Sequence, residues 1–323
     1  MRLTNLNNIP LPLAVWLATS NYDGNKEPNE ISVTILMKPL KQIILSKRVN
    51  KDDLCLDVSS LAASTIGTAL HDSIEQAWLN PNDALTRLGI SEMGISKIKI
   101  NPDPSTVAED DIAIYMEQRA YKKVGTKVVS GKYDLIFDGQ VQDYKSTSVY
   151  TYLNNDSKKT DYILQGSIYR WLNPDLITKD TIAINYILKD WSATRALGDA
   201  TYPRTALIQE EYPLLSLEQT DRYIRNKLRD INRYMDSPEE DIPECSSEDL
   251  WRGEAVFKYY ASDTATRSSK NFSNMVDAAM HMSSKGGRGF IKQVDGKAKA
   301  CSYCMAATIC QQRAELAAAN ELG

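Results

Sequence analysis

Residues 131–147 read GKYDLIFDGQVQDYKST, and this stretch decides how the middle of the chain folds. The apolar run before its Asp-Gly pair and the alternating run after it predict two antiparallel strands joined by a tight turn. Side chains two apart in a strand point the same way, so Asp143 and Lys145 share one face of the second strand. The hairpin can then bring Asp134 beside Asp143.

Two carboxylates this close repel each other unless a cation lies between them. Carboxylate oxygens are the ligands that Mg²⁺ and Mn²⁺ prefer. A lysine beside such an ion can hold an attacking water or steady the charge on a phosphate, which outlines a site for phosphodiester hydrolysis. The same pattern also occurs on ordinary ion-paired surfaces, so its context decides between the two interpretations.

A helix expected at about residues 57–79 carries His71, one of only two histidines in the chain. The helical spacing of its apolar residues makes this helix long and partly buried. His71 there is either a packed structural side chain or a metal ligand, whereas His281 has no comparable setting. The apolar positions are Leu61, Ala62, Ile66, Ala69, Leu70, Ile74 and Trp78.

A second helix, expected at about residues 160–172, follows the hairpin and contains Gln165 and Tyr169. These residues are four apart, so they share a helix face and can donate to a phosphate or contact a base. The alternative is a helix packed on the sheet with both side chains partly exposed.

The order of these pieces resembles the RecB-like branch of the PD-(D/E)xK nuclease superfamily. A Gly-x-x-x-His helix, a Gly-x-x-Asp strand, an Asp-x-Lys strand and a Gln-x-x-x-Tyr helix follow one another within about residues 31–172. The pattern looks most like small phage exonucleases, and it is similar to the nuclease domains of bacterial helicase–nucleases and CRISPR-adaptation nucleases. The resemblance implies an α/β, restriction-endonuclease-like core, in which a mixed central sheet is flanked by helices.

The resemblance also implies roles for the matching residues. The family's proline before the first acid is Tyr133 here, and Glu75 and Glu117 are acidic neighbours that we place around the metal rather than on it. The implied roles are metal ligands for His71, Asp134, Asp143 and the Tyr144 carbonyl, the catalytic lysine for Lys145, and DNA contacts for Gln165 and Tyr169.

Three of the five cysteines fall within CSYCMAATIC, residues 301–310. Thiolates bind soft or borderline metals, and a Cys-x-x-Cys turn lets two of them reach one ion or cluster. A disulfide or simple burial of the thiols is the alternative. In a reducing cytoplasm, which we expect for a DNA-directed enzyme, metal binding is favoured over a disulfide.

In the related nucleases the same spacing of Cys301, Cys304 and Cys310 closes a [4Fe–4S] cluster, and a fourth ligand is needed. The usual N-terminal ligand is replaced by Lys38. Cys245, which follows Pro243 and precedes Trp251 as in phage relatives, is favoured over Cys55. Zinc is the alternative to the cluster, and either would clamp a C-terminal module onto the core.

Composition fits a soluble intracellular enzyme with one large or two small domains. The chain has 323 residues, is 42% hydrophobic and carries a net charge of −4, so only a local groove can attract nucleic acid. One basic strip contains Lys285, Arg288, Lys292, Lys297 and Lys299 beside Asp295. Such a strip is either part of a nucleic-acid groove or a solvated loop with the same composition. No apolar run reaches the ~18 residues of a membrane span, and two prolines disfavour a signal peptide near residues 9–19.

The expected domains are residues 1–236 for the nuclease core and 237–323 for the cysteine module. A capping box at Ser216 predicts a helix to about Met235, with Leu217, Ile224, Leu228 and Ile231 on its buried side. The tail beyond it is poorly periodic apart from a short Ala-rich helix. Further elements are expected as a helix at about 32–47 and as strands at about 112–124, 127–138, 140–146, 181–189 and 204–212.

The function that this resemblance implies is a Mg²⁺- or Mn²⁺-dependent DNA exonuclease in phage recombination, repair or processing, in the cytoplasm of the host. A single-strand annealing protein or a helicase is the implied protein partner. A structure-specific endonuclease of the same fold and a non-catalytic DNA-binding scaffold are the alternatives.

Overall fold

The structure is a computed structural model that describes residues 2–19, 29–50, 52, 54–154 and 156–323. The chain forms two compact units. The first unit comprises Met1–Met37 and Lys51–Arg229, and the second comprises Lys38–Asn50 and Asp230–Gly323. None of the helices in the described ranges combines the length and apolar content that crossing a membrane requires.

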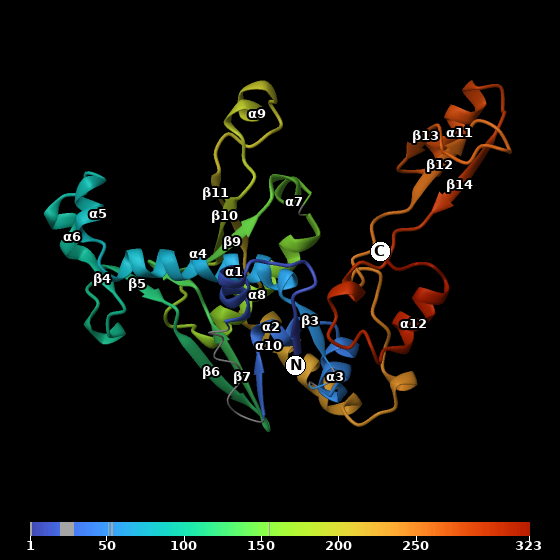
Figure 1. Cartoon of the computed structure of the whole chain (residues 1–323). Coiled ribbons are helices and arrows are strands. Elements are labelled where there is room, and N and C mark those ends of the chain that lie inside the picture. Colours follow the sequence, from blue (N-terminus) through green and yellow to red (C-terminus); the bar gives the residue numbers. More distant parts are fainter. Residues whose placement is uncertain (1, 20–28, 51, 53, 155) are drawn as a thin grey trace. The chain divides into compact units, whose positions relative to one another are not determined.

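The centre of the first unit is a mixed sheet (Figure 1), which confirms the expected α/β class. β9 pairs in parallel with β10, and β4 with β5, whereas the remaining neighbours are antiparallel. In order across the sheet the six strands are β11 (Leu207–Pro213), β10 (Thr181–Leu188), β9 (Gln140–Thr147), β8 (Leu135–Phe137), β5 (Ile112–Met116) and β4 (Ile98–Ile100).

A second sheet of the first unit contains three strands: β2 (Glu30–Ser32), β7 (Lys127–Lys132) and β6 (Arg119–Val124). The chain passes from the six-stranded sheet to this one between β5 and β6, and it returns between β7 and β8. The expected strands 112–124 and 127–138 are therefore wrong as single strands. Each is interrupted where the chain changes sheets, the first at Glu117–Gln118 and the second at Tyr133–Asp134.

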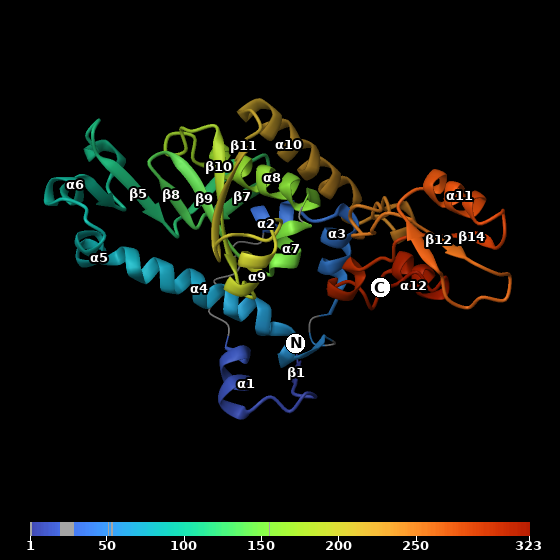
Figure 2. The same cartoon turned by 90° about the horizontal axis from the view of Figure 1, so that it is seen from above.

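Two helices sandwich the six-stranded sheet, α4 (Ala62–Leu79) on one face and α8 (Asp156–Leu172) on the other (Figure 2). The ring of His71 on α4 lies against Tyr144 of β9, whereas Gln165 on α8 donates to Asp143. Because adjacent strand residues face opposite ways, Tyr144 points to α4 and its two neighbours point to α8. The long helix predicted around His71 is confirmed, and it is only partly buried along its whole length.

Close packing on both faces fixes these helices. On the α4 side, Trp78 packs against buried side chains of β5 and β8, including Met116 and Leu135. On the α8 side, Gly166 allows the helix to approach β10, because a Cβ there would lie only 2.8 Å from Ile182 Cδ1. Such a short contact forces a neighbour to move, so this position favours glycine.

The hairpin that joins β8 to β9 forms as the sequence predicts. Asp138 and Gly139 both have positive φ, 48° and 76°, as the two-residue hairpin turn requires. Short elements complete the first unit: β1 (Arg2–Thr4), α1 (Leu11–Ala18), α2 (Val33–Leu36), β3 (Cys55–Asp57), η2 (Val58–Leu61), α5 (Asn82–Arg87), α6 (Glu92–Lys97), η3 (Pro104–Thr106), α7 (Val149–Leu153) and α9 (Ala193–Gly198).

Helix α10 (Leu217–Tyr234) begins with the predicted capping box. Ser216 N–H donates to Gln219 Oε1 at 2.9 Å, and Gln219 N–H donates to Ser216 Oγ at 3.1 Å. The expected buried face is confirmed apart from Leu217, which is 44% exposed. Thr220, which is fully buried, takes the first position on that face instead.

The second unit joins the end of α10 to α3 (Leu40–Arg48), far away in sequence. The expected helix at 32–47 is wrong as one element, because Pro39 separates α2 from α3 and the two belong to different units. The expected domain boundary at residue 236 accordingly shifts into α10, at residue 229. Ile44, Leu45, Ile242 and Ala306 form the core of the second unit.

The C-terminal tail contains more regular structure than its sequence predicts. Three antiparallel strands, β12 (Val256–Tyr260), β13 (Lys270–Phe272) and β14 (Phe290–Val294), form a small sheet with β12 in the middle. Helix α11 (Met275–Ser284) packs on one face of it. The remaining elements are η4 (Glu239–Asp241), η5 (Ala300–Tyr303) and α12 (Gln311–Ala318), the last being the expected Ala-rich helix.

Candidate metal centre and cysteine cluster

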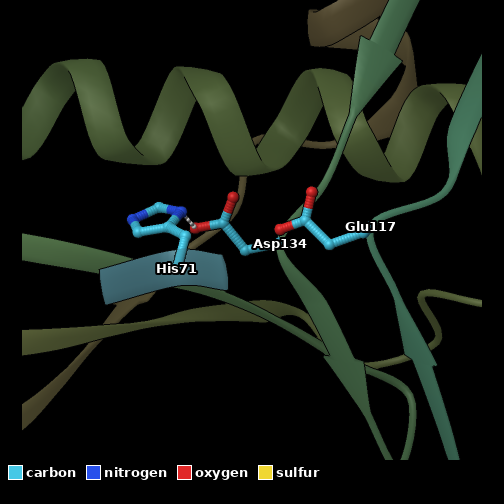
Figure 3. Close-up of side chains that lie close together, drawn as sticks. All are labelled: His71, Glu117 and Asp134. Atoms are coloured by element: carbon cyan, nitrogen blue, oxygen red, sulfur yellow. Dashed lines mark ion pairs between the residues drawn. The ribbon is translucent and has the colours of Figure 1, made fainter. Parts of the chain in front are cut away.

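Three side chains converge where the chain passes between the two sheets of the first unit. They are His71 from α4, Glu117 between β5 and β6, and Asp134 between β7 and β8, and they point toward one another (Figure 3). One ligand atom from each lies within 4.8 Å of the other two. One imidazole nitrogen and two carboxylates are a donor set for a divalent cation.

A backbone hydrogen bond holds the two acids together. The N–H of Glu117 donates to the carbonyl oxygen of Asp134 at 3.1 Å. Glu117 has a φ of 52°, a left-handed conformation that costs a non-glycine residue on the order of 1 kcal/mol or more. This local strain turns the Glu117 side chain toward Asp134 instead of continuing β5 in an extended conformation.

The two ring nitrogens of His71 have different neighbours. Nε2 lies 3.1 Å from the carbonyl oxygen of Tyr144. Because a carbonyl oxygen only accepts hydrogen bonds, Nε2 carries a proton and donates to it. Nδ1 lies 3.4 Å from Asp134 Oδ2. Two lone pairs would then face each other in a neutral histidine, and either a second proton or a metal cation relieves that repulsion.

The charges around the centre are unevenly balanced. The contact with Asp134 raises the pKa of His71, in opposition to burial, as it must when a carboxylate faces the ring. Burial raises the pKa of Glu117, and Lys132, whose Nζ lies 2.5 Å from Glu117 Oε2, only partly offsets this. The His71 shift therefore reflects the carboxylate beside the ring, whereas the Glu117 shift reflects mainly burial.

Asp143 and Lys145 form the second part of the site, on the α8 side of β9. Asp143 is almost completely buried, and its Oδ2 forms an ion pair with Lys145 Nζ at 2.6 Å. Its Oδ1 accepts from Gln165 at 2.9 Å, and Gln165 also donates to the hydroxyl of Tyr169 at 3.2 Å. The two carboxylate oxygens of Asp143 therefore have different partners, Gln165 on Oδ1 and Lys145 on Oδ2.

Burial governs the ionisation of this pair. Burial raises the pKa of Asp143, and the nearby charge of Asp134 adds to the effect, while Lys145 opposes it. Burial acts to lower the pKa of Lys145, but the Asp143 carboxylate outweighs it, so this pKa is raised. Lys145 is consequently held as a cation beside the acidic cluster.

A cleft of about 640 Å³ opens onto the centre. The metal-ligand candidates His71, Glu117 and Asp134 line it, together with Tyr169 and cationic Arg119 and Lys132. Part of its wall comes from the N-terminal segment, whose helix α1 packs through Ala14 and Leu17 onto η2. The remaining lining is mostly small or hydroxyl-bearing: Ser32, Thr34, Ser64, Thr65, Thr68 and Ala69 among others.

The structure brings together most of the residues that the sequence singled out, with one correction. Asp143 lies near His71 and Asp134, yet the third member of the compact cluster is Glu117, which the sequence analysis kept off the metal. Asp143 instead binds Lys145 and Gln165. Gln165 and Tyr169 hold Asp143 from α8, and their role as DNA contacts stays a prediction. The only sequence signal for Glu117 is an acid in the break between two strand-like runs.

The four favoured cysteines all lie in the second unit as free thiols, whereas Cys55 is exposed in the first unit. Burial, the Asp249 carboxylate and the other three cysteines together raise the pKa of Cys245 to about 12, so the four thiols lie near one another. Cys304 and Cys310 pack against the apolar core of this unit.

A pair of hydrogen bonds joins the Cys245 segment to the tail. Cys245 N–H donates to Gln312 Oε1, and Gln312 Nε2 donates back to the carbonyl oxygen of Cys245, both at 2.9 Å. Gln312 is buried in α12, which starts directly after Cys310. Among the described side chains, the four sulfurs are not close enough together to share a single ion as they stand.

No protein-family model matches this chain, and no curated protein matches it either. A solved structure described as "Crystal structure of SSO0001" is similar to it, with 19% identity, 67% of this chain and 81% of that chain covered, and a TM-score of 0.39. So distant a likeness carries no information about function.

Proposed function

We propose that the chain is a Mg²⁺- or Mn²⁺-dependent DNA nuclease of the RecB-like PD-(D/E)xK type, acting as an exonuclease. The observation that carries the proposal is the convergence of His71, Glu117 and Asp134 in a cleft, beside the Asp143–Lys145 pair. An acidic cluster alone is common on proteins. A lysine cation held close to such a cluster is the further element that phosphodiester hydrolysis needs.

The donor set fits a divalent ion held by His71, Glu117 and Asp134. Nδ1 of His71 and Oδ2 of Asp134 face each other at 3.4 Å, and burial raises the pKa of the Glu117 carboxyl beside them. Asp143 and the Tyr144 carbonyl, which the sequence resemblance names as ligands, lie next to this set. When bound, such an ion would lower the pKa of a water and neutralise a phosphate.

The role proposed for Lys145 is to stabilise charge on the scissile phosphate and to orient the attacking water. Asp143 holds its ammonium group in place, and Gln165 in turn holds Asp143. This chain of contacts from α8 fixes a cation whose side chain is only 31% exposed. A charge held rigidly in a partly dry site stabilises a transition state more than a mobile surface lysine does.

The cysteine module is proposed to hold a [4Fe–4S] cluster through Cys245, Cys301, Cys304 and Cys310. Four free thiols in one unit supply the ligands that such a cluster takes. Retained thiols also favour a reducing compartment, so the proposed location is the cytoplasm, of the host cell if a phage encodes the chain. DNA is the proposed partner, and a helicase or single-strand annealing protein would deliver it.

Digestion of end-labelled linear DNA and of covalently closed circular DNA with Mn²⁺ tests the proposal. Degradation of linear DNA alone supports the exonuclease, and cutting of circles supports an endonuclease of the same site. Asp134→Asn should abolish either activity. Asp138→Asn, which removes one carboxylate from the nearby hairpin turn, is the matched control and should retain it. A wild-type protein that binds DNA but cleaves neither substrate would favour a non-catalytic scaffold and overturn the proposal.

A further inference from the structure

The small sheet of the second unit is inserted between Cys245 and Cys301, and its segment carries an excess of basic residues. Residues 256–299 contain eight lysines and arginines against three acidic residues, although the whole chain carries a net charge of −4. The basic residues are Lys258, Arg267, Lys270, Lys285, Arg288, Lys292, Lys297 and Lys299, and the acidic ones are Asp263, Asp277 and Asp295. Such local concentration of charge favours a polyanionic partner.

Helix α11 covers one face of this sheet. His281 on α11 lies against the rings of Tyr259 and Phe272, with ring centroids 5.0 and 5.2 Å away, and Ala278 on the same helix is completely buried. Tyr259 is 3% exposed, so the side chains that point toward α11 form the small core of this module.

The opposite face carries a lysine pair and an aromatic pair, which we name the Lys–aromatic face. Lys258 lies directly opposite Lys292 on the neighbouring strand, and Tyr260 lies opposite Phe290. Residues two apart on a strand share a face, so all four side chains point away from α11. Their positions range from half-buried to exposed. Like charges directly opposite each other destabilise a sheet, so the lysine pair is costly unless an anion binds it.

The two aromatic rings are stacked. Their planes differ by 3° and their centroids are 4.7 Å apart. Gly289 makes this possible, because a Cβ at that position would lie 1.9 Å from the carbonyl oxygen of Tyr260, and its φ is +83°. The preceding loop also has positive φ at Gly286 and Gly287 and exposes Arg288, an arrangement whose backbone N–H groups suit an anion.

We infer that the Lys–aromatic face binds single-stranded DNA, with the lysines on phosphates and an unpaired base stacked on the Tyr260–Phe290 pair. Bases of a duplex are already stacked on one another and cannot reach a flat sheet face, whereas unpaired bases can. Aromatic platforms flanked by cations are the general solution for binding single strands. The inference rests on the proposed DNA nuclease for the identity of the nucleic acid, and it adds the strandedness of the substrate.

Fluorescence anisotropy with labelled dT20 and with a 20-base-pair duplex tests this, using full-length protein in buffer free of Mg²⁺ and Mn²⁺. Lys258→Glu with Lys292→Glu should weaken dT20 binding at least tenfold and reduce the salt dependence, by about 0.7 per lost phosphate contact. Lys123→Glu with Arg222→Glu makes the same change in net charge at exposed sites of the first unit, and it should leave binding close to wild type.

The stacking contribution is tested separately. Tyr260→Leu with Phe290→Leu keeps apolar side chains on the sheet but removes the rings, and it should weaken dT20 binding about tenfold without changing the salt dependence. Tyr260→Trp should retain binding, and its added fluorescence should be quenched by dT20. This variant keeps the test decisive if the leucine pair unfolds the module.

Equal binding of duplex and dT20 by the wild-type protein would overturn the single-strand assignment. An equal loss of dT20 affinity in the Lys123→Glu, Arg222→Glu control would show that only net charge matters and would overturn the proposed binding face. DNA binding that depends on this face in a protein without any cleavage would refute the proposed nuclease and leave the inference intact. Normal cleavage together with unimpaired dT20 binding in both double variants would refute the single-strand binding face and leave the proposed nuclease intact.

Discussion

Replacing Glu117 with glutamine tests the assignment of this residue to the metal centre. The change removes one negative charge and keeps the side chain almost the same size. Glu117 and Asp134 bring carboxylate oxygens within 4.8 Å, and at an effective dielectric of about 20 two such charges repel by at least ~3.5 kcal/mol. Lys132 opposes this repulsion through its ion pair with Glu117, so the net effect in the metal-free protein is smaller.

The pKa of Glu117 decides whether Glu117→Gln raises or lowers the Tm of the metal-free protein. Burial raises the pKa of Glu117, so its carboxylate is less favourable in the folded than in the unfolded state. An acid of this kind costs stability once the pH exceeds its unfolded pKa. At neutral pH Glu117→Gln should therefore raise the Tm of the metal-free protein slightly.

The metal-bound protein should behave in the opposite way. At a hundredfold excess over the dissociation constant, Mn²⁺ stabilises a protein by about 2.7 kcal/mol, which corresponds to roughly 5–10 °C for a unit of about 200 residues. Thermal unfolding with increasing Mn²⁺ should show this rise in the wild type and little of it in Glu117→Gln.

Glu75→Gln is the matched control for this measurement. Glu75 lies on α4 one turn beyond His71, and its charge acts on Glu117, but it is outside the compact cluster. It should keep the full metal-induced rise in Tm. A full rise in Glu117→Gln, or loss of the rise in Glu75→Gln alone, would refute the ligand role of Glu117.

Three further outcomes are expected. Lys145→Met should lower kcat at least about a hundredfold while the Mn²⁺-induced rise in Tm persists, since its role is in the transition state; a proportional loss of DNA binding would make it a substrate-binding group. Anaerobically purified protein should be brown, and Cys304→Ser should bleach it whereas Cys55→Ser should not; colourless protein with one zinc ion would refute the cluster. Gly166→Ala should lower the free energy of unfolding by about 1–3 kcal/mol in denaturant titrations, because the added methyl group meets Ile182 on β10, and an unchanged stability would contradict the observed packing.

Much of the site was predictable because its parts are local. The Asp-Gly turn fixes the hairpin, and the alternation after it puts Asp143 and Lys145 side by side, as their 2.6 Å contact confirms. Helical periodicity placed His71 on α4, and the reciprocal hydrogen bonds at Ser216 formed as a capping box should. Each of these features depends on residues within a few positions of one another.

The small C-terminal sheet escaped prediction for a different reason. Its strands have three to five residues, and the side chains of β12 alternate between a covered face and the Lys–aromatic face. Such short strands carry too weak a periodic signal, and their pairing across long loops is not encoded locally. The same holds for α3, whose apolar side chains contact a segment about two hundred residues away.

The sequence by itself determined the hairpin, the helix with His71 and the set of thiols, because turn chemistry, periodicity and composition are properties of neighbouring residues. Only the tertiary structure placed Glu117 beside Asp134. That contact needs a left-handed φ at Glu117 and a hydrogen bond to a residue seventeen positions away, at the point where two strands leave one sheet for another. Sheet membership is set by the packing of the whole unit, so no local pattern could have identified the third member of the cluster.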